Sequence, residues 1–166
     1  MTPLSIRVAN LQDAAAVTAL LEASYTSQLA GRYSPQVLAR ALPLMTRANP
    51  RLLKSGTYYL VHAGTKLVGC GGWSKEPPGS GAIKEGSAHI RHLATHPHWL
   101  RHGIGRKLLI RCFDEAASAG IGSLECLSTL VAVDFYVATG FKVMRPLPMK
   151  LAPDIIIDGV LLRRVL

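Results

Sequence analysis

The sequence has no long hydrophobic run. Among its 166 residues, no stretch approaches the roughly 18 consecutive apolar residues that a membrane-crossing helix needs. Residues 1–5 also lack the charged and apolar regions of a signal peptide. We therefore expect a cytoplasmic protein that has no membrane partner.

Cysteine is scarce. The three cysteines, Cys70, Cys112 and Cys126, are odd in number and show no C-x-x-C spacing, which argues against a disulfide framework and against a zinc knuckle. All three lie in apolar surroundings, so we expect reduced core residues. Cys112 and Cys126 also have no histidine at a recognisable spacing, and this disfavours a reaction through a cysteine acyl-enzyme.

Charged residues are few, and acidic residues are fewer than basic ones. Charged residues make up 17% of the chain and apolar residues 49%, which excludes a disordered chain and predicts one globular domain over residues 1–166. Ten acidic residues against 19 basic ones leave a net charge of +9, which suits an anionic partner or a strongly solvated surface. Basic residues are spread from Arg7 to Arg164 and aromatic residues are only 6%, which disfavours nucleic acid as the partner.

Apolar spacing predicts the element order β, α, α, β, β, β, α, β, α, β, β. Strands are expected at residues 5–9, 57–62, 66–73, 88–94, 123–128, 141–144 and 155–165. Helices are expected between Asn10 and Gly31, from Ser34 until Pro43 kinks or ends the helix, between Gly103 and Gly120, and over residues 131–139. Residues 75–86, rich in proline, glycine and charge, form the expected long loop.

This order predicts an α/β fold with a mixed, mostly antiparallel central sheet and helices on both faces. The strands at 57–62 and 66–73 read as an antiparallel hairpin, whereas a right-handed crossover makes the strands at 88–94 and 123–128 parallel. Simple alternation in the strand at 88–94 places His89, Arg91 and Leu93 on one face. It places Ile90, His92 and Ala94 on the other.

A basic glycine loop precedes the best-defined helix. Gly103 and Gly105 allow open backbone dihedrals, and the helix start that follows directs unpaired N–H groups to the same point, which suits a phosphate. A P-loop is excluded because its spacing and its hydroxyl are missing. A dinucleotide fold stays open, with Glu125 as the ribose-binding acid, although Leu108 stands where that fold has its third glycine.

Four segments in order resemble the acetyl-CoA-binding core of the GNAT superfamily of N-acetyltransferases. They lie at residues 92–97, 101–109, 127–130 and 135–141, the last reading F-Y-x-x-x-G-F, and the similarity is close over 88–144 and loose over the whole chain. The resemblance implies an N-acetyltransferase fold. It also implies direct transfer of acetyl from acetyl-CoA to a primary amine of a small molecule or peptide while both substrates are bound. The alternative is a non-catalytic CoA- or nucleotide-binding regulatory module.

The same resemblance implies roles for single residues. The pantetheine arm of acetyl-CoA would run along the backbone of Leu93, Ala94 and Thr95, and Tyr136 would protonate the departing thiolate as general acid. The pyrophosphate would sit on the loop formed by Arg101, His102, Gly103, Ile104, Gly105 and Arg106. The chain departs from the family at Leu100, where glutamine or arginine is usual, and at Val131, where asparagine is frequent.

The general base is expected to be His92 or His89, since histidine accepts protons near neutral pH, while Glu76 and Glu85 lie in the preceding loop. No metal site is predicted, although five of the six histidines crowd into residues 89–102, because strand alternation separates two of them and the other three lack a recognised ligand spacing.

The acceptor pocket is expected to draw on residues 25–33, on the loop at 74–87 and on the C-terminal strands, and no motif there names a substrate. The apolar residues at 155–157 and 160–162 could form a homodimer interface or bury one face within a monomer, and the sequence leaves both open.

Overall fold

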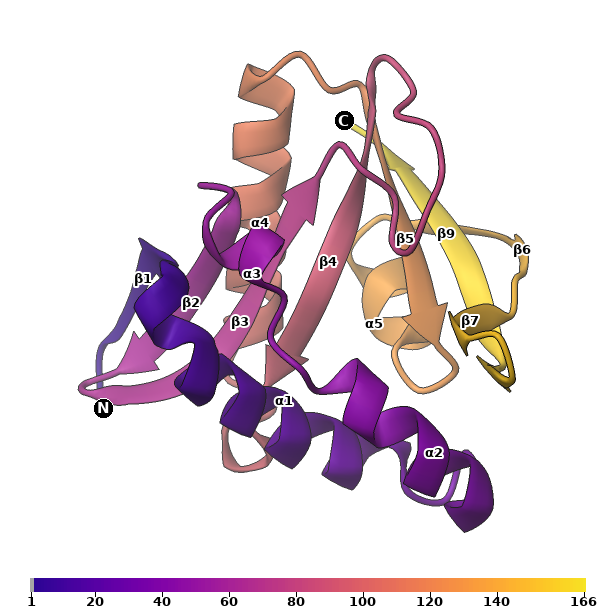
Figure 1. Cartoon of the computed structure of the whole chain (residues 1–166). Helices are drawn as coiled ribbons and strands as arrows, with labels where there is room; N and C mark the ends of the chain where they lie inside the picture. The colour runs from indigo at the N-terminus through magenta and orange to yellow at the C-terminus, as the bar shows by residue number, and fades with distance from the viewer. Residues whose placement is uncertain (1) are drawn as a thin grey trace.

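The structure is a computed structural model that describes residues 2–166, and it is built on one large sheet (Figure 1). The seven strands run in the order β1 (Leu4–Val8), β2 (Tyr58–Ala63), β3 (Lys66–Ser74), β4 (Ser87–Thr95), β5 (Ser123–Thr129), β9 (Gly159–Val165) and β6 (Lys142–Pro146). Every neighbouring pair is antiparallel except β4 and β5. The predicted mixed, mostly antiparallel sheet is therefore confirmed, as is the parallel pairing after the crossover.

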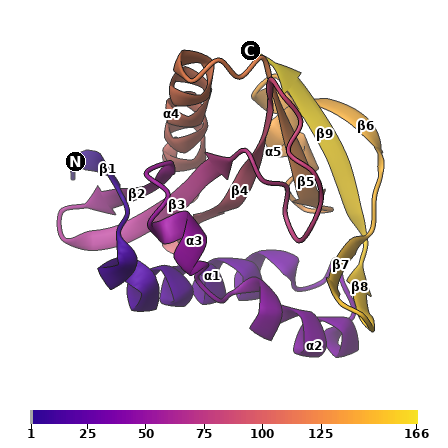
Figure 2. The same cartoon turned by 45° about the horizontal axis from the view of Figure 1, so that its top comes forward.

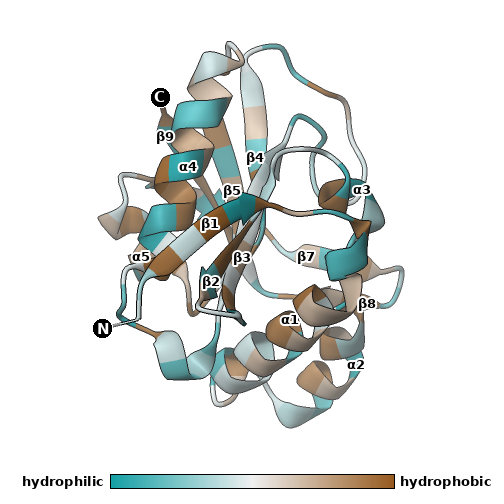
Figure 3. Ribbon diagram, turned by 90° about the vertical axis from the view of Figure 1, so that its left-hand side faces the viewer, coloured by the Kyte–Doolittle hydropathy of each residue, from teal (hydrophilic) through white to brown (hydrophobic). Residues whose placement is uncertain are grey.

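Helices cover both faces of this sheet. They are η1 (Leu11–Asp13), α1 (Ala14–Leu29), α2 (Pro35–Met45), α3 (Pro50–Leu53), η2 (Pro97–Trp99), α4 (Ile104–Ser118) and α5 (Val133–Ala138). Figure 3 shows α4 on one side of the sheet and α1 with α2 on the other. None of the helices described in residues 2–166 has the length and apolarity needed to cross a bilayer.

Each face of the sheet has its own hydrophobic cluster. On the α4 and α5 side the fully buried side chains include Leu108, Leu109 and Leu124, packed against the strands. On the α1 side, Leu21 packs against Leu60 and its neighbours. The helices α4 and α1 present their apolar stripes to opposite faces, and burying both stripes fixes the three-layer arrangement.

Capping residues begin the N-terminal helices where the sequence predicts. The Asn10 side chain accepts a hydrogen bond from the Gln12 N–H at 2.9 Å, and the Asp13 carboxylate accepts one from the Asn10 N–H at 2.8 Å. One turn of 3₁₀ helix precedes α1. In α2, Ser34 caps the start as predicted, but Pro43 lies inside the last turn and the helix continues to Met45. A proline so near the end removes one helical hydrogen bond, which the helix tolerates there.

Two short elements escape the sequence pattern. The first is the single turn α3, and the second is the strand β7 (Met149–Ala152), which pairs with β8 (Ile155–Ile157) in a small separate sheet. The single strand predicted at residues 155–165 is therefore wrong, because β8 and β9 belong to different sheets. Figure 2 shows this hairpin beside α2. An ion pair at 2.6 Å joins Arg40 of α2 to Asp154 in the hairpin turn. Residues 75–86 form the predicted loop between β3 and β4.

The alternation predicted for β4 is wrong beyond Arg91. Ile90 and Leu93 both pack on the α4 side, whereas Ala94 packs on the α1 side. The cause is a β-bulge, because Gly72 pairs with Arg91 and Cys70 with Ala94, which leaves one extra residue in β4. His92, at the bulge, has a left-handed backbone with φ of 45°. The extra residue shifts every later side chain to the opposite face.

Candidate functional site

The parallel pair β4 and β5 is joined over a short length. Three residue pairs are in register, and the last of them is His89 with Glu125. Beyond this point the two strands diverge (Figure 1), so the backbone of β4 from Ile90 to Thr95 pairs with β3 on one side and has no strand partner on the other. Backbone N–H and C=O groups along such an edge are available to a ligand that pairs as a strand does.

Two tyrosines, the buried Tyr58 and the partly buried Tyr25, fix the backbone at the bulge. The hydroxyl of Tyr58 on β2 donates to the His92 carbonyl at 2.9 Å, and the hydroxyl of Tyr25 on α1 donates to the Leu93 carbonyl at 3.3 Å. A trans peptide is planar, so the Leu93 N–H points opposite to the His92 carbonyl. Since Tyr58 belongs to the α1-side cluster, the Leu93 N–H is turned away from that cluster.

The loop before α4 takes the open conformation that its glycines predict. Arg101 and Gly103 are both left-handed, with φ of 62° and 74°. The first hydrogen bond of the helix runs from the Lys107 N–H to the Gly103 carbonyl at 2.9 Å. The N–H groups of Ile104, Gly105 and Arg106 precede it and have no partner within the helix. This loop directly follows β4 and η2, so it lies next to the open edge of β4.

Gly105 has a packing role that the glycine pattern does not reveal. A Cβ atom added at Gly105 would lie 2.8 Å from the ring of Phe135 on α5. The missing side chain therefore lets α5 approach the start of α4. This contact joins the glycine loop to the F-Y-x-x-x-G-F segment, two motifs that the sequence shows far apart.

Tyr136 is held in an aromatic cluster. Its side chain is 6% exposed, and its ring lies edge-on to Phe135 and Phe141 at centroid distances of 5.2 and 5.4 Å. Burial raises the pKa of Tyr136 well above its ordinary value, and the nearby thiol of Cys126 on β5 raises it further. Tyr25, which reaches in from α1, adds a smaller upward effect on the same pKa. Side chains from both faces of the sheet therefore meet where β4 and β5 diverge.

The two candidate bases lie in different surroundings. Burial and the neighbouring Arg91 lower the pKa of His92 to about 4. His89 Nδ1 lies 3.9 Å from the Glu125 carboxylate. Burial lowers the pKa of His89, with Arg91 and Lys84 acting in the same direction, while Glu125 opposes the shift. Both histidines are therefore neutral at pH 7.

The cysteines are buried and protonated. Burial raises the pKa of Cys112 and that of Cys126 to about 12. A thiol with such a pKa is a weak nucleophile at neutral pH. Across residues 2–166, no three His, Cys, Asp or Glu side chains gather closely enough to hold a metal ion.

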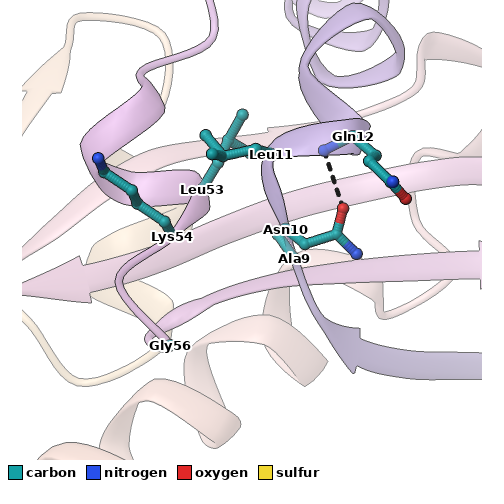
Figure 4. A pocket seen from close by; sticks show the side chains of 7 residues that line it. All are labelled: Ala9, Asn10, Leu11, Gln12, Leu53, Lys54 and Gly56. Atoms are coloured by element: carbon teal, nitrogen blue, oxygen red, sulfur yellow. Dashed lines mark hydrogen bonds between the residues drawn. The ribbon is translucent and has the colours of Figure 1, made fainter.

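The surface also has two hollows. One, of about 620 Å³, lies between the end of β1, η1 and α3, and Lys54 is its one charged side chain (Figure 4). The other, of about 640 Å³, lies beside the last β4–β5 residue pair and includes Glu125 in its wall. Residues 84–87 of the predicted acceptor loop line it, together with residues of β6 and β9.

Sequence reasoning located the β4 end, the glycine loop and Tyr136, and the structure brings these three together. It missed Tyr58, and it considered Glu125 only as the ribose-binding acid of the dinucleotide alternative. The parallel crossover places β5 beside β4, but only the three-dimensional register shows that Glu125 faces His89.

Comparison with known proteins gives a consistent result. Residues 17–141 match the acetyltransferase (GNAT) family. The PaiA N-acetyltransferase of Thermoplasma acidophilum, solved with coenzyme A, has 16% identity and a TM-score of 0.75, with 99% of each chain covered. A GCN5-related N-acetyltransferase of Rhodopseudomonas palustris has 20% identity and a TM-score of 0.79, over 100% of this chain and 98% of that one.

A larger protein contains a similar domain. N-acetylglutamate synthase of Neisseria gonorrhoeae, solved with coenzyme A and N-acetyl-glutamate, has 20% identity and a TM-score of 0.66. The match covers 100% of this chain and 36% of that one. No curated protein matches the sequence at a significant level.

The contact between Gly105 and Phe135 predicts the effect of a single methyl group. We expect Gly105→Ala to lower the free energy of unfolding by roughly 1–3 kcal/mol, because the new Cβ overlaps the ring. Combining it with Phe135→Leu should cost less than the sum of the two single changes. Urea unfolding of all four proteins measures this, and strict additivity would show that the contact does not limit the packing.

The partly buried, neutral His92 predicts acid sensitivity. Its pKa of about 4 lies below the ordinary 6.5, so between these values the unfolded chain binds more protons, and stability falls as the pH drops through that window. We expect His92→Asn, which tolerates a left-handed backbone, to flatten this dependence by up to about 3 kcal/mol. Urea unfolding from pH 7 to pH 4 measures it. His98→Asn, an exposed control, should leave the slope unchanged, and an unchanged slope in His92→Asn contradicts the prediction.

Proposed function

Since this chain belongs to the GNAT family of acetyltransferases, we propose that it transfers the acetyl group of acetyl-CoA to a primary amine in one direct step. The family uses acetyl-CoA as its cosubstrate, and the resemblance seen in the sequence is confirmed. The observation that carries the proposal is the open edge of β4, near which the start of α4 and Tyr136 pack in one cluster with Leu93.

The residues around this edge fit CoA. The free backbone of Leu93, Ala94 and Thr95 would pair with the amides of the pantetheine arm, as a neighbouring strand would. The loop from Arg101 to Arg106 would hold the pyrophosphate through the N–H groups at the start of α4. Its basic side chains add attraction for a cofactor with several negative charges.

The bulge orients one backbone hydrogen-bond donor, the Leu93 N–H. Tyr58 holds the His92 carbonyl, and the planar peptide then fixes the direction of the Leu93 N–H. In the proposed reaction this N–H donates to the carbonyl oxygen of the acetyl group, where negative charge develops. A donor held in place before the reaction stabilises that charge without reorganisation, and Tyr58 therefore acts as a positioning residue.

Tyr136 is the proposed general acid. Bound acetyl-CoA supplies the thioester, and the departing sulfur must receive a proton. Burial at this place raises the pKa of the Cys126 thiol to about 12 and that of the Tyr136 phenol as well. The same desolvation would raise the pKa of the departing thiol, so the pKa values of the proton donor and the proton acceptor shift in the same direction.

Proton removal from the amine is proposed for one of two histidines. His92 remains the base that the sequence predicts, although a pKa of about 4 makes it a weak proton acceptor. His89 has the stronger case because Glu125, at 3.9 Å, would stabilise the imidazolium that forms. His89 and Glu125 face away from the α4 and α5 cluster, whereas the glycine loop begins α4. The two substrates would therefore approach from opposite faces of the sheet and could be bound at the same time, as direct transfer requires.

Replacing the proposed acid gives the first functional test. We expect Tyr136→Phe to lower kcat by about 10²-fold or more, because the ring packing is kept and the acidic proton is lost. The affinity for acetyl-CoA, measured by calorimetry, should change less than about threefold. A thiol-release assay with an amine panel measures kcat. An unchanged kcat removes Tyr136 as the acid, and binding of acetyl-CoA without transfer to any amine by the unmodified protein supports the regulatory alternative.

The pH dependence of kcat/KM separates the two histidines. The lowered pKa of His89 places its titration below pH 6.5, and kcat/KM should rise as the pH increases through it. The amine acceptor must also lose a proton, so the logarithm of kcat/KM should rise with a slope of about two in that range. We expect His89→Gln to reduce the slope to about one.

His92→Asn serves as the matched comparison for this profile. If His92→Asn reduces the slope and His89→Gln does not, His92 is the base.

A further inference from the structure

The hollow beside the last β4–β5 residue pair has an unusual set of charges. Besides Glu85 and Glu125, its wall carries Lys84 from the β3–β4 loop, Arg145 from β6 and Arg163 from β9. No ion pair within residues 2–166 involves any of these three basic side chains. Arg163 donates to the hydroxyl of Ser123 at 3.3 Å, which leaves most of its donors free.

The position of the hollow relates it to the reaction. Glu125 is the register partner of both His89 on β4 and Arg163 on β9, so these three residues lie side by side across the sheet. The neighbours of Glu125 along β5, Leu124 and Cys126, belong to the α4 and α5 cluster. Alternation therefore turns Glu125 to the other face, the one opposite the glycine loop.

The wall thus combines two acids, of which Glu125 lies beside His89, with three basic side chains that form no ion pair within residues 2–166. Three cations around one hollow repel each other, and an anion between them would relieve that repulsion. Glu125 favours a positively charged ammonium next to His89. A volume of about 640 Å³ falls in the range of sites for small molecules.

We propose that this hollow binds the acceptor and that the acceptor is a small amine that also carries an acid group, a carboxylate or a phosphate. The inference rests on the proposed function. The acid group is bound by Arg163, Arg145 and Lys84, and the amine lies toward Glu125 and His89. The acceptor reacts as the neutral amine: its nitrogen lone pair forms the bond to the acetyl carbon, the bond from that carbon to sulfur breaks, and sulfur keeps the electron pair and takes the proton of Tyr136. His89 takes one proton from the nitrogen, and solvent returns a proton to the tyrosinate.

Matched substrate series test the acid group. The ω-amino acids from glycine to 6-aminohexanoate are compared with n-alkylamines of equal length, and phosphoethanolamine with ethanolamine. We expect kcat/KM to be at least tenfold higher for the best acid-bearing amine than for its matched alkylamine, because a charge-assisted hydrogen bond is lost in the latter. Comparison of phosphoethanolamine with the ω-amino acids shows whether a phosphate or a carboxylate is preferred. Equal kcat/KM values for acid-bearing and plain amines overturn the proposal.

Variants locate the binding of the acid group. In Arg163→Gln and Arg145→Gln we expect the preference for the acid-bearing amine over its alkylamine to fall about tenfold. Arg51→Gln, on α3 and outside the hollow, should keep the full preference. If the preference is unchanged in both hollow variants, the acid group binds elsewhere and the proposal is wrong.

A binding measurement separates this inference from the proposed function. The acid-bearing amines should raise the thermal midpoint of the unmodified protein, and Arg163→Gln should abolish that rise. If acetyl-CoA binds and none of the acid-bearing amines raises the midpoint, the acceptor inference is wrong while the cofactor site stands. If acetyl-CoA itself neither binds nor reacts, the proposed function fails, whereas a rise that depends on Arg163 still supports an anion site in the hollow.

Discussion

The bulge at His92 is the constraint on which the rest of the site depends. One extra residue in β4 turns the His92 carbonyl toward Tyr58, and the rigid peptide then turns the Leu93 N–H to the opposite side. Because of this extra residue, Ile90 and Leu93 both pack on the α4 face, and Ala94 packs on the α1 face. A left-handed non-glycine residue costs free energy, and partly buried hydrogen bonds from two tyrosines hold it in place.

Burial sets the proton chemistry of the opening between β4 and β5. It raises the pKa of Tyr136 and of Cys126, and it lowers the pKa of His92 and of His89, so that all four groups are neutral at pH 7. In such surroundings a charge that appears during a reaction interacts strongly with fixed dipoles such as the Leu93 N–H. The Glu125 carboxylate lies 3.9 Å from His89 Nδ1 and opposes the effect of burial on the pKa of that histidine.

The sequence predicts the large elements, since caps such as Ser34 and turns such as the one before Lys66 act through local chemistry. It also predicts the glycine loop and Tyr136 through their motifs. Three features escape it. The bulge depends on cross-strand pairing with β3, the pairing of His89 with Glu125 depends on the register of two strands joined by a helix, and the contact of Gly105 with Phe135 depends on how α5 docks. Each is set by tertiary contacts that no short sequence pattern encodes.

The three residue pairs between β4 and β5 also have a mechanical meaning. They divide the sheet into two plates, one formed by β1 to β4 and the other by β5, β9 and β6, with a seam of a few backbone hydrogen bonds between them. Helix α4 packs on the first plate, while α5 touches both its start, through Gly105, and the edge strand β6 of the second. The hydrophobic cluster on the α4 and α5 face includes Ile90 of the first plate and Leu124 and Leu162 of the second, so packing across the seam, rather than backbone pairing, sets the width of the opening.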